Sequence, residues 1–147
     1  MKRNIRRGVW ETNSSSVHTI SIDKSGLEPS ELPIKNGKIQ IDFGSFDKEE
    51  KYYSSQYDKL SYLITCCYYI CGYGLEDIYE CWTFRDIERV VCKYAGADGI
   101  EILNKAEPYI DHQSRPESDI EIINMYHDEE IINFVFNRYI SLKTESD

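Results

Sequence analysis

The sequence lacks any apolar run long enough to cross a membrane. No stretch of its 147 residues approaches the roughly 20 consecutive apolar residues that a spanning helix requires. The opening is basic rather than apolar, with Lys2, Arg3, Arg6 and Arg7 followed by Trp10 and a polar stretch. This order does not match a secretory signal, whose basic start leads into an apolar segment. No membrane partner is expected, and a cytoplasmic protein is predicted.

Basic residues are also scarce. The chain has 17 lysines and arginines against 26 aspartates and glutamates, and its formal net charge is -9. Such a chain repels phosphate backbones, so direct binding of nucleic acid is not expected. It would instead complement a basic groove on a protein, including a groove that normally holds DNA or RNA. Acidity that only keeps the protein soluble explains the same composition.

No recognised metal motif is present. The chain has no C-x-x-C pair and no H-E-x-x-H segment, so no metal or other cofactor is predicted. Its five cysteines are an odd number in a chain without an export signal, and reduced thiols are the expectation. Cys67 and Cys71 can meet Cys92 in space, but they fall on an apolar stripe. A cysteine in such a stripe behaves as a small hydrophobic residue rather than as a zinc ligand.

Two segments in the first half of the chain alternate as strands do. Residues 17–22 and 39–43 place apolar side chains at every second position. Glycine and proline between them predict a loop over 23–37. A further short strand is predicted at 100–102, with 109–112 returning beside it as a hairpin.

Helical spacing dominates the remaining segments. It predicts a first helix that starts at Asp47 or at Ser55 and stops at Gly72 and Gly74. Further helices are predicted from Thr83 to Gly96, from Ser118 to Met125 and from Asp128 onward, and residues 75–82 are ambiguous. Together these elements predict a single α+β domain over 1–147. Its small, mostly antiparallel sheet of about four short strands packs against about three or four helices. A basic arm at 1–9 and a frayed tail at 143–147 are expected to flank it.

The most distinctive segment follows the basic opening. It combines carboxylate, amide, hydroxyl and imidazole groups in Glu11, Thr12, Asn13, Ser14, Ser15, Ser16 and His18. Asparagine and serine side chains favour a turn, and exposed hydroxyls and amides can hold a phosphate or a carboxylate. His18 can act as an acid or a base near neutral pH. A serine-rich turn that leads into a strand, with His18 packed beside Ile20, explains the same residues.

A second polar segment lies in the predicted hairpin. It consists of Asp111, His112, Gln113 and Ser114. Strand alternation sends the first and third of these to one face and the other two to the opposite face. If the strands are neighbours, His18 and His112 can converge, with Ser15 as a candidate nucleophile and Asp111 orienting a histidine. No G-x-S-x-G elbow and no Walker pattern accompany them.

Both polar segments carry a resemblance. The opening R-x-x-R-R-G-V-W-E-T-N-S-S-S-V-H, at residues 3–18, resembles the N-terminal signature of small uncharacterised proteins of phages and prophages of Gram-positive bacteria. The run I-D-H-Q-S at 110–114 resembles a second element of the same group. The group has no settled activity, so the resemblance assigns no catalytic residue. It implies a phage-encoded protein in the host bacterial cytosol, for which host takeover and counter-defence are common roles.

Tyrosine is unusually abundant, with twelve residues against five phenylalanines. Seven of them lie between residues 52 and 73, more than one helix face can bury, so some rings must reach the surface. Nearby carboxylates predict a tyrosine-and-carboxylate interface made of Asp47, Glu49, Glu50, Tyr52, Tyr53 and Tyr57. Lys48, Lys51 and Lys59 dilute that acidity, and a solvated helix face explains the same pattern.

These features favour a phage accessory protein that binds and inhibits a host protein. The host protein can be a nucleic-acid-binding defence nuclease, as for an anti-CRISPR protein. The alternative is a nucleotide-binding or phosphoester-processing enzyme that uses the serine-rich turn with His18 and His112. A third possibility is a virion or regulatory component without a small-molecule site.

Overall fold

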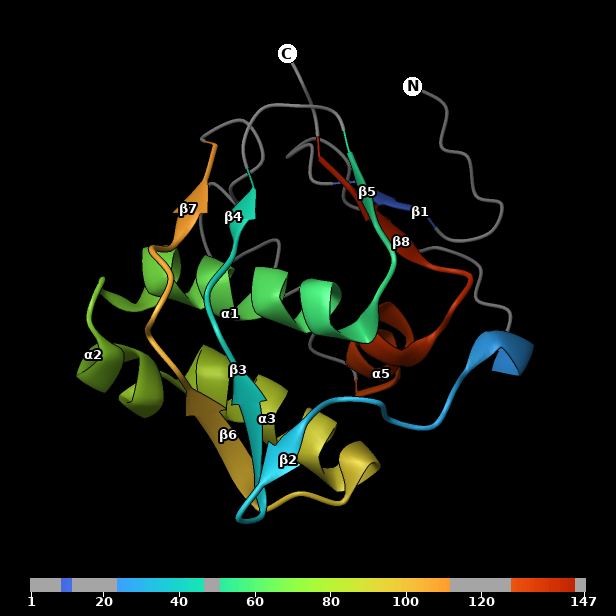
Figure 1. Cartoon of the computed structure of the whole chain (residues 1–147), viewed down its shortest axis with the longest axis horizontal. Coiled ribbons are helices and arrows are strands. Elements are labelled where there is room, and N and C mark those ends of the chain that lie inside the picture. Colours follow the sequence, from blue (N-terminus) through green and yellow to red (C-terminus); the bar gives the residue numbers. More distant parts are fainter. Residues whose placement is uncertain (1–8, 12–23, 47–50, 112–127, 145–147) are drawn as a thin grey trace.

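A computed structural model of the chain describes residues 9–11, 24–46, 51–111 and 128–144 (Figure 1). Its helices are α1 (Gln56–Cys71), α2 (Leu75–Glu80), α3 (Trp82–Ala95) and α5 (Asp128–Phe136), with a 3-10 turn at Lys24–Gly26. Its strands are β1 (Val9–Glu11), β2 (Ile34–Lys35), β3 (Lys38–Ile41), β4 (Ser45–Phe46), β5 (Tyr52–Tyr53), β6 (Gly99–Ile102), β7 (Tyr109–Ile110) and β8 (Ser141–Lys143). The predicted α+β class is confirmed.

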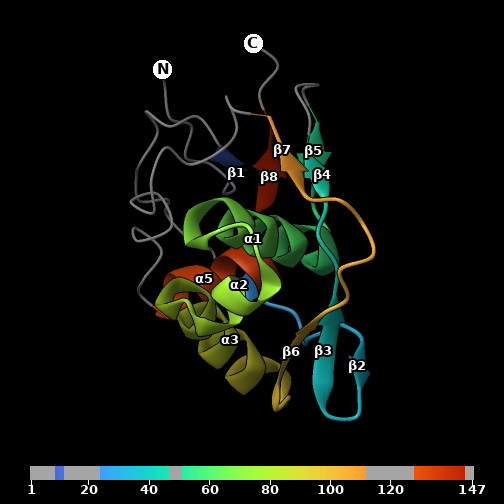
Figure 2. The ribbon, with the colours of Figure 1, turned by 90° about the vertical axis from the view of Figure 1, so that its left-hand side faces the viewer.

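One layer of the fold is a sheet in which β3 lies between β2 and β6. β3 and β6 are parallel, with Ile39 opposite Ile100 and Ile41 opposite Ile102. All four isoleucines are buried, because alternate residues of a strand face one side and the helices cover that side (Figure 2). Burial of one such side chain contributes about 1.5–3 kcal/mol, so this sheet–helix contact is a main part of the core.

Both strands of this parallel pair are interrupted and then resume. They continue as β4 and β7, which are again parallel, with Phe46 opposite Ile110. Asp42 holds the interruption together, because its carboxylate accepts hydrogen bonds from the backbone N–H groups of Lys105 and Ala106 at 3.1 and 3.2 Å. The connection between β6 and β7 is thereby tied to the connection between β3 and β4.

The strand pairing differs from the sequence prediction in two ways. Three pairings among the described strands are parallel, those of β3 with β6, β4 with β7 and β1 with β8, so the sheets are small and mixed rather than mostly antiparallel. The predicted hairpin of 109–112 with 100–102 is wrong, because β7 pairs with β4. The cause is the connection between β4 and β6, which contains α1, α2 and α3. A crossover of that length lets strands run in parallel, as a tight turn does not.

The limits of two helices follow local signals. Ser55 caps α1 by accepting a hydrogen bond from the backbone N–H of Asp58 at 3.0 Å, and Gly72 ends the helix, as predicted. α3 ends at Gly96, which adopts the left-handed conformation with φ 77°. α3 begins at Trp82 rather than Thr83, and the ambiguous residues before it form α2. The alternative helix start at Asp47 lies outside the described residues.

α1 is the central helix of the core. Its buried side chains include Leu60, Leu63, Ile64 and Cys67, and it contacts β3, α3 and α5. Among the described parts of the chain, no helix is long and apolar enough to cross a membrane.

The last described residues belong to the core rather than to a frayed tail. α5 begins at Asp128, as predicted, and β8 lies between β1 and β5. Lys143 ends β8, and Thr144 is fully buried and donates its backbone N–H to the carbonyl of Lys51 at 2.9 Å. The tail therefore does not fray at 143. Residues 145–147, most of the basic arm and the elements predicted at 17–22 and 118–125 lie outside the described residues.

Candidate functional site

The serine-rich segment at 12–18 lies outside the described residues. Only Glu11 before it is included, as the last residue of β1, opposite Lys143. Residues 112–114 also lie outside, so Asp111 alone represents the second segment. β1 pairs with β8 and β7 pairs with β4, and both strands lie above α1 in Figures 1 and 2. The convergence of the two histidines remains a prediction.

Asp111 is buried directly after β7. Its backbone N–H donates to the carbonyl of Phe46 at 2.8 Å, which extends the parallel pairing of β7 with β4. The hydroxyl of Tyr109 donates to its Oδ1 at 3.4 Å. These contacts give Asp111 a structural role at the end of β7, whether or not it also belongs to a site.

The predicted tyrosine interface is divided by the fold. The hydroxyl of Tyr57 faces inward and accepts a hydrogen bond from a backbone N–H after β3 at 3.1 Å. Tyr53 packs against Phe46 with ring centroids 5.1 Å apart. Tyr52 is 59% exposed, and Lys143 Nζ lies 6.0 Å from its ring centroid. Two of the three tyrosines therefore serve the fold. The predicted acidic members, Asp47, Glu49 and Glu50, lie outside the described residues.

Tyrosine hydroxyls also cover the outer edge of β6 and β7. The backbone N–H of Ile102 donates to Tyr79 Oη at 2.9 Å, and that of Ile110 donates to Tyr69 Oη at 3.3 Å. A further N–H of β6 donates to the carboxylate of Glu88 at 2.9 Å. An added strand would use these same groups, so side chains of the three helices block that edge. Part of the tyrosine abundance is thus explained without any ligand.

The sequence suggested that Lys59 dilutes the acidity of the surface. The structure contradicts this, because Lys59 is buried and only 1% exposed. Its ammonium group donates to the carbonyls of Asn137 at 3.0 Å and Ile140 at 2.7 Å, just beyond α5. Burial lowers the pKa of Lys59 to about 8. Carbonyls at the end of a helix lack intrahelical partners and attract a cation. Lys59 therefore fastens α1 to the turn that follows α5.

Exposed aromatic side chains gather around α2. Tyr73, Tyr79 and Trp82 are 63, 37 and 58% exposed. Tyr73 rests on Tyr68 and Tyr69 at the end of α1, with ring centroids 5.2 and 6.2 Å apart. The residues between the aromatic side chains add exposed carboxylates. We refer to Tyr73, Glu76, Asp77, Tyr79, Glu80 and Trp82 together as the α2 surface.

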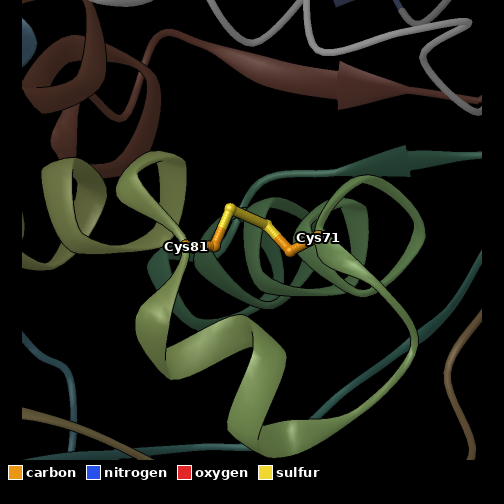
Figure 3. The surroundings of a disulfide bond; sticks show 2 residues. All are labelled: Cys71 and Cys81. Atoms are coloured by element: carbon orange, nitrogen blue, oxygen red, sulfur yellow. A yellow bond between two sulfur atoms is a disulfide. The ribbon is translucent and has the colours of Figure 1, made fainter.

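A disulfide braces the α2 surface (Figure 3). It joins Cys71 at the end of α1 to Cys81 between α2 and α3, with the two Cα atoms 5.9 Å apart. Tyr73 and Trp82 therefore lie within two residues of the same bridge. The prediction of reduced thiols is wrong for these two cysteines. The cause is that α2 folds back and brings the ends of α1 and α3 together, which a count of cysteines cannot reveal.

Tyr73 has a left-handed backbone conformation, with φ 67°. It follows Gly72, and its N–H donates to the carbonyl of Tyr68 at 3.0 Å, which completes the C-terminal turn of α1. A non-glycine residue in this conformation costs on the order of 1–2 kcal/mol. Strain of this kind gathers at functional positions. An exposed tyrosine held here therefore points to a role outside the fold.

The other cysteines, Cys66, Cys67 and Cys92, are buried. Burial raises the pKa of Cys67 to about 12 and that of Cys92 to about 11, so both remain thiols at neutral pH. Cys71 is already bonded, so the trio considered for zinc is not available in this form. Within the described residues, no group of three or more histidine, cysteine, aspartate or glutamate side chains is placed to hold a metal ion.

Comparison of the chain with protein-family models, with curated proteins and with solved structures found no match. The function is therefore argued from the site. Sequence reasoning missed Tyr79 and Trp82 because it left residues 75–82 unassigned. The available signal was the composition of 76–82, which contains three carboxylates, two aromatic residues and no basic residue.

Proposed function

We propose that this chain works by binding another protein through the α2 surface. The observation that carries the proposal is the exposure of Tyr73 and Trp82 beside three carboxylates of α2. Tyrosine and tryptophan are enriched among the residues that dominate binding energy, because each buries a large, rigid area at a small cost in conformational entropy. Tyrosine and tryptophan are also enriched at interfaces relative to the rest of a protein surface.

The backbone around Tyr73 supports the same proposal. Glycine or asparagine would occupy its left-handed position with less strain, yet a tyrosine stands there with its ring exposed. The packing of Tyr73 on Tyr68 restrains the surface before any partner arrives. Such preorganisation reduces the entropy lost on association.

Within this function, we propose an inhibitory role toward a host protein. The net charge of -9 and the resemblance of residues 3–18 to phage and prophage proteins support this setting. An acidic protein with exposed aromatic side chains can occupy a basic groove and exclude the nucleic acid that the groove normally holds. A defence nuclease of the bacterial cytosol is therefore the partner class that we propose.

The proposal is tested by capture from lysate of a bacterial host, with bound proteins quantified by mass spectrometry. Trp82→Ala and Tyr73→Ala are each expected to reduce the retained partner at least tenfold, since interface aromatic residues often contribute about 2 kcal/mol or more. Ile34→Ala is the control, because Ile34 is 45% exposed but lies on β2, outside both predicted interfaces. A partner retained equally by all three variants contradicts the role of the α2 surface.

Inhibition requires its own measurement. The activity of the retained partner is titrated with the chain, and complete loss at equal molar amounts is expected. Activity that is unchanged at saturation would leave a binding protein without an inhibitory role. The Trp82→Ala variant should need at least tenfold more protein for the same inhibition.

A further inference from the structure

A more specific inference rests on the proposed function and concerns the chemistry of the partner. We infer that the α2 surface takes up an arginine- or lysine-bearing segment of a partner protein. The cationic groups of that segment would lie over the exposed rings and against the carboxylates of α2. Charge and ring contacts within the described chain both lead to this assignment.

The charge around α2 has one sign. Between Lys59 and Arg85 the chain carries three carboxylates, at Glu76, Asp77 and Glu80, and no basic residue. All three are exposed, and none forms an ion pair with a described residue. The carboxylate of Asp77 lies against the segment that carries Tyr73, since a Cβ placed on Gly72 would be 2.9 Å from Asp77 Oδ2. A cation bound here meets carboxylates that no cation of the described chain already neutralises.

The rings of the α2 surface also have no cation over them among the described residues. Elsewhere in the described chain, Lys143 Nζ lies 6.0 Å from the ring centroid of Tyr52, and Arg138 Cζ lies 4.7 Å from that of Tyr139. No described lysine or arginine lies over the rings of the α2 surface. Indole is the aromatic ring that attracts cations most strongly, and a guanidinium group can also stack on it. Trp82 is therefore the preferred ring for an arginine of the partner.

Other occupants fit this surface less well. Nucleic acid would bring phosphates to a face that is already negative. A second copy of this acidic chain would have to offer basic residues of its own, and its densest basic cluster is Lys2, Arg3, Arg6 and Arg7. The experiment separates that outcome from binding of a different protein.

The first measurement uses Trp82 as the reporter. Trp10→Phe leaves Trp82 as the sole tryptophan, and its fluorescence is titrated with a short peptide of alternating arginine and glycine. A matched glutamate–glycine peptide is the control. We expect a saturable change with the arginine peptide that weakens with added salt, and no change with the glutamate peptide. Equal responses to both peptides, or to neither, overturn the inference.

The second measurement removes the charge. The combined Glu76→Gln, Asp77→Asn and Glu80→Gln substitutions are expected to weaken binding of the arginine peptide about tenfold. The matched control removes three carboxylates elsewhere, through Glu31→Gln, Asp58→Asn and Asp98→Asn. If the triple variant unfolds, Glu80→Lys replaces it in the same binding measurement. This variant reverses one charge at the end of α2 and leaves the first turn of the helix unchanged. Equal weakening by the α2 variants and the control overturns the inference.

The last measurements separate the two levels of the proposal. If Trp82→Ala abolishes capture of a partner while the carboxylate variants and the peptides have no effect, the α2 surface binds a protein but not through a basic segment, and the further inference is overturned. If neither Trp82→Ala nor the carboxylate variants alter capture, the proposed function and the further inference are both overturned. Light scattering that shows a dimer, dissociated by neutralising the basic residues at 2–7, would identify a second copy as the occupant and overturn the inference.

Discussion

Replacement of Lys59 by methionine gives the most quantitative test of the fold. The side chain is buried, and its ammonium group donates to two backbone carbonyls beyond α5, those of Asn137 and Ile140. The substitution removes two charge-assisted hydrogen bonds, each worth about 1.5–3 kcal/mol. It also removes the cost of burying the charge. A pKa of about 8 in place of 10.5 sets that cost at roughly 3 kcal/mol. The two effects oppose one another, so Lys59→Met should destabilise the fold at pH 7 by about 0–3 kcal/mol.

The dependence on pH has a definite sign. The folded chain releases the Lys59 proton near pH 8, and the unfolded chain near pH 10.5. The unfolded state therefore binds more protons between these values, and the free energy of unfolding rises with pH across this window. Relative to that of Lys59→Met, the free energy of unfolding of the unchanged protein should rise by about 2 kcal/mol between pH 7 and pH 9.5. This part of the stability is missing below pH 8, where the buried amine is charged.

The assay is urea denaturation of both proteins at a series of pH values, followed by circular dichroism. Taking the difference between them cancels the ionisation of groups that they share. Lys93→Met, which removes the same charge from an exposed position of α3, is the control for loss of a lysine as such. A difference between the unchanged protein and Lys59→Met that stays constant from pH 7 to 9.5 would refute the buried charge.

Two further predictions concern the segment around α2. Tyr73→Gly should be more stable than Tyr73→Ala by about 1 kcal/mol, because both remove the ring and only alanine keeps the left-handed strain. Both should lose the partner equally, and equal stabilities in urea denaturation would contradict the strain. Cys71→Ser combined with Cys81→Ser opens a loop that spans a sequence separation of 10, and chain entropy sets the loss at about 2.7 kcal/mol. A thiol reductant should destabilise the unchanged protein by the same amount and leave the double variant unaffected. A reductant effect on both would indicate another cause.

The elements that sequence reasoning placed correctly depend on local signals. Ser55 and Gly72 limit α1, and Gly96 ends α3. A cap, a left-handed glycine and a 3.6-residue apolar period each act over a few residues. They can therefore be recognised without knowing what the helix packs against. The strand predicted at 39–43 from its alternation is present as β3, which ends earlier, at Ile41.

The partners of the strands depend on distant parts of the chain. Residues 109–110 carry no local signal that favours pairing with β4 over pairing with β6. The choice follows from the way α1, α2 and α3 fill the connection between β4 and β6. Pairing energies of short strands are small and similar, so the packing of the helices decides among them.

The roles of single side chains were the least predictable. Lys59 and Tyr57 have polar groups that suit a surface, yet the structure gives both of them backbone partners, buried for Lys59 and partly buried for Tyr57. Whether such a group is buried depends on whether the fold supplies a hydrogen-bond partner for it. That partner comes from a segment far away in the chain.

By itself, the sequence determined the α+β class, the central helices and the acidic net charge, because these follow from local periodicity and from summed charge. Only the tertiary structure decided which tyrosines support the fold and which remain exposed. In the folded chain, backbone N–H groups donate hydrogen bonds to the hydroxyls of Tyr57, Tyr69 and Tyr79. Tyr73 and Trp82 remain exposed to solvent. The physical reason is that exposure is a property of the packed chain. Cys71 and Cys81, at a sequence separation of 10, become neighbours only when α2 folds back between α1 and α3.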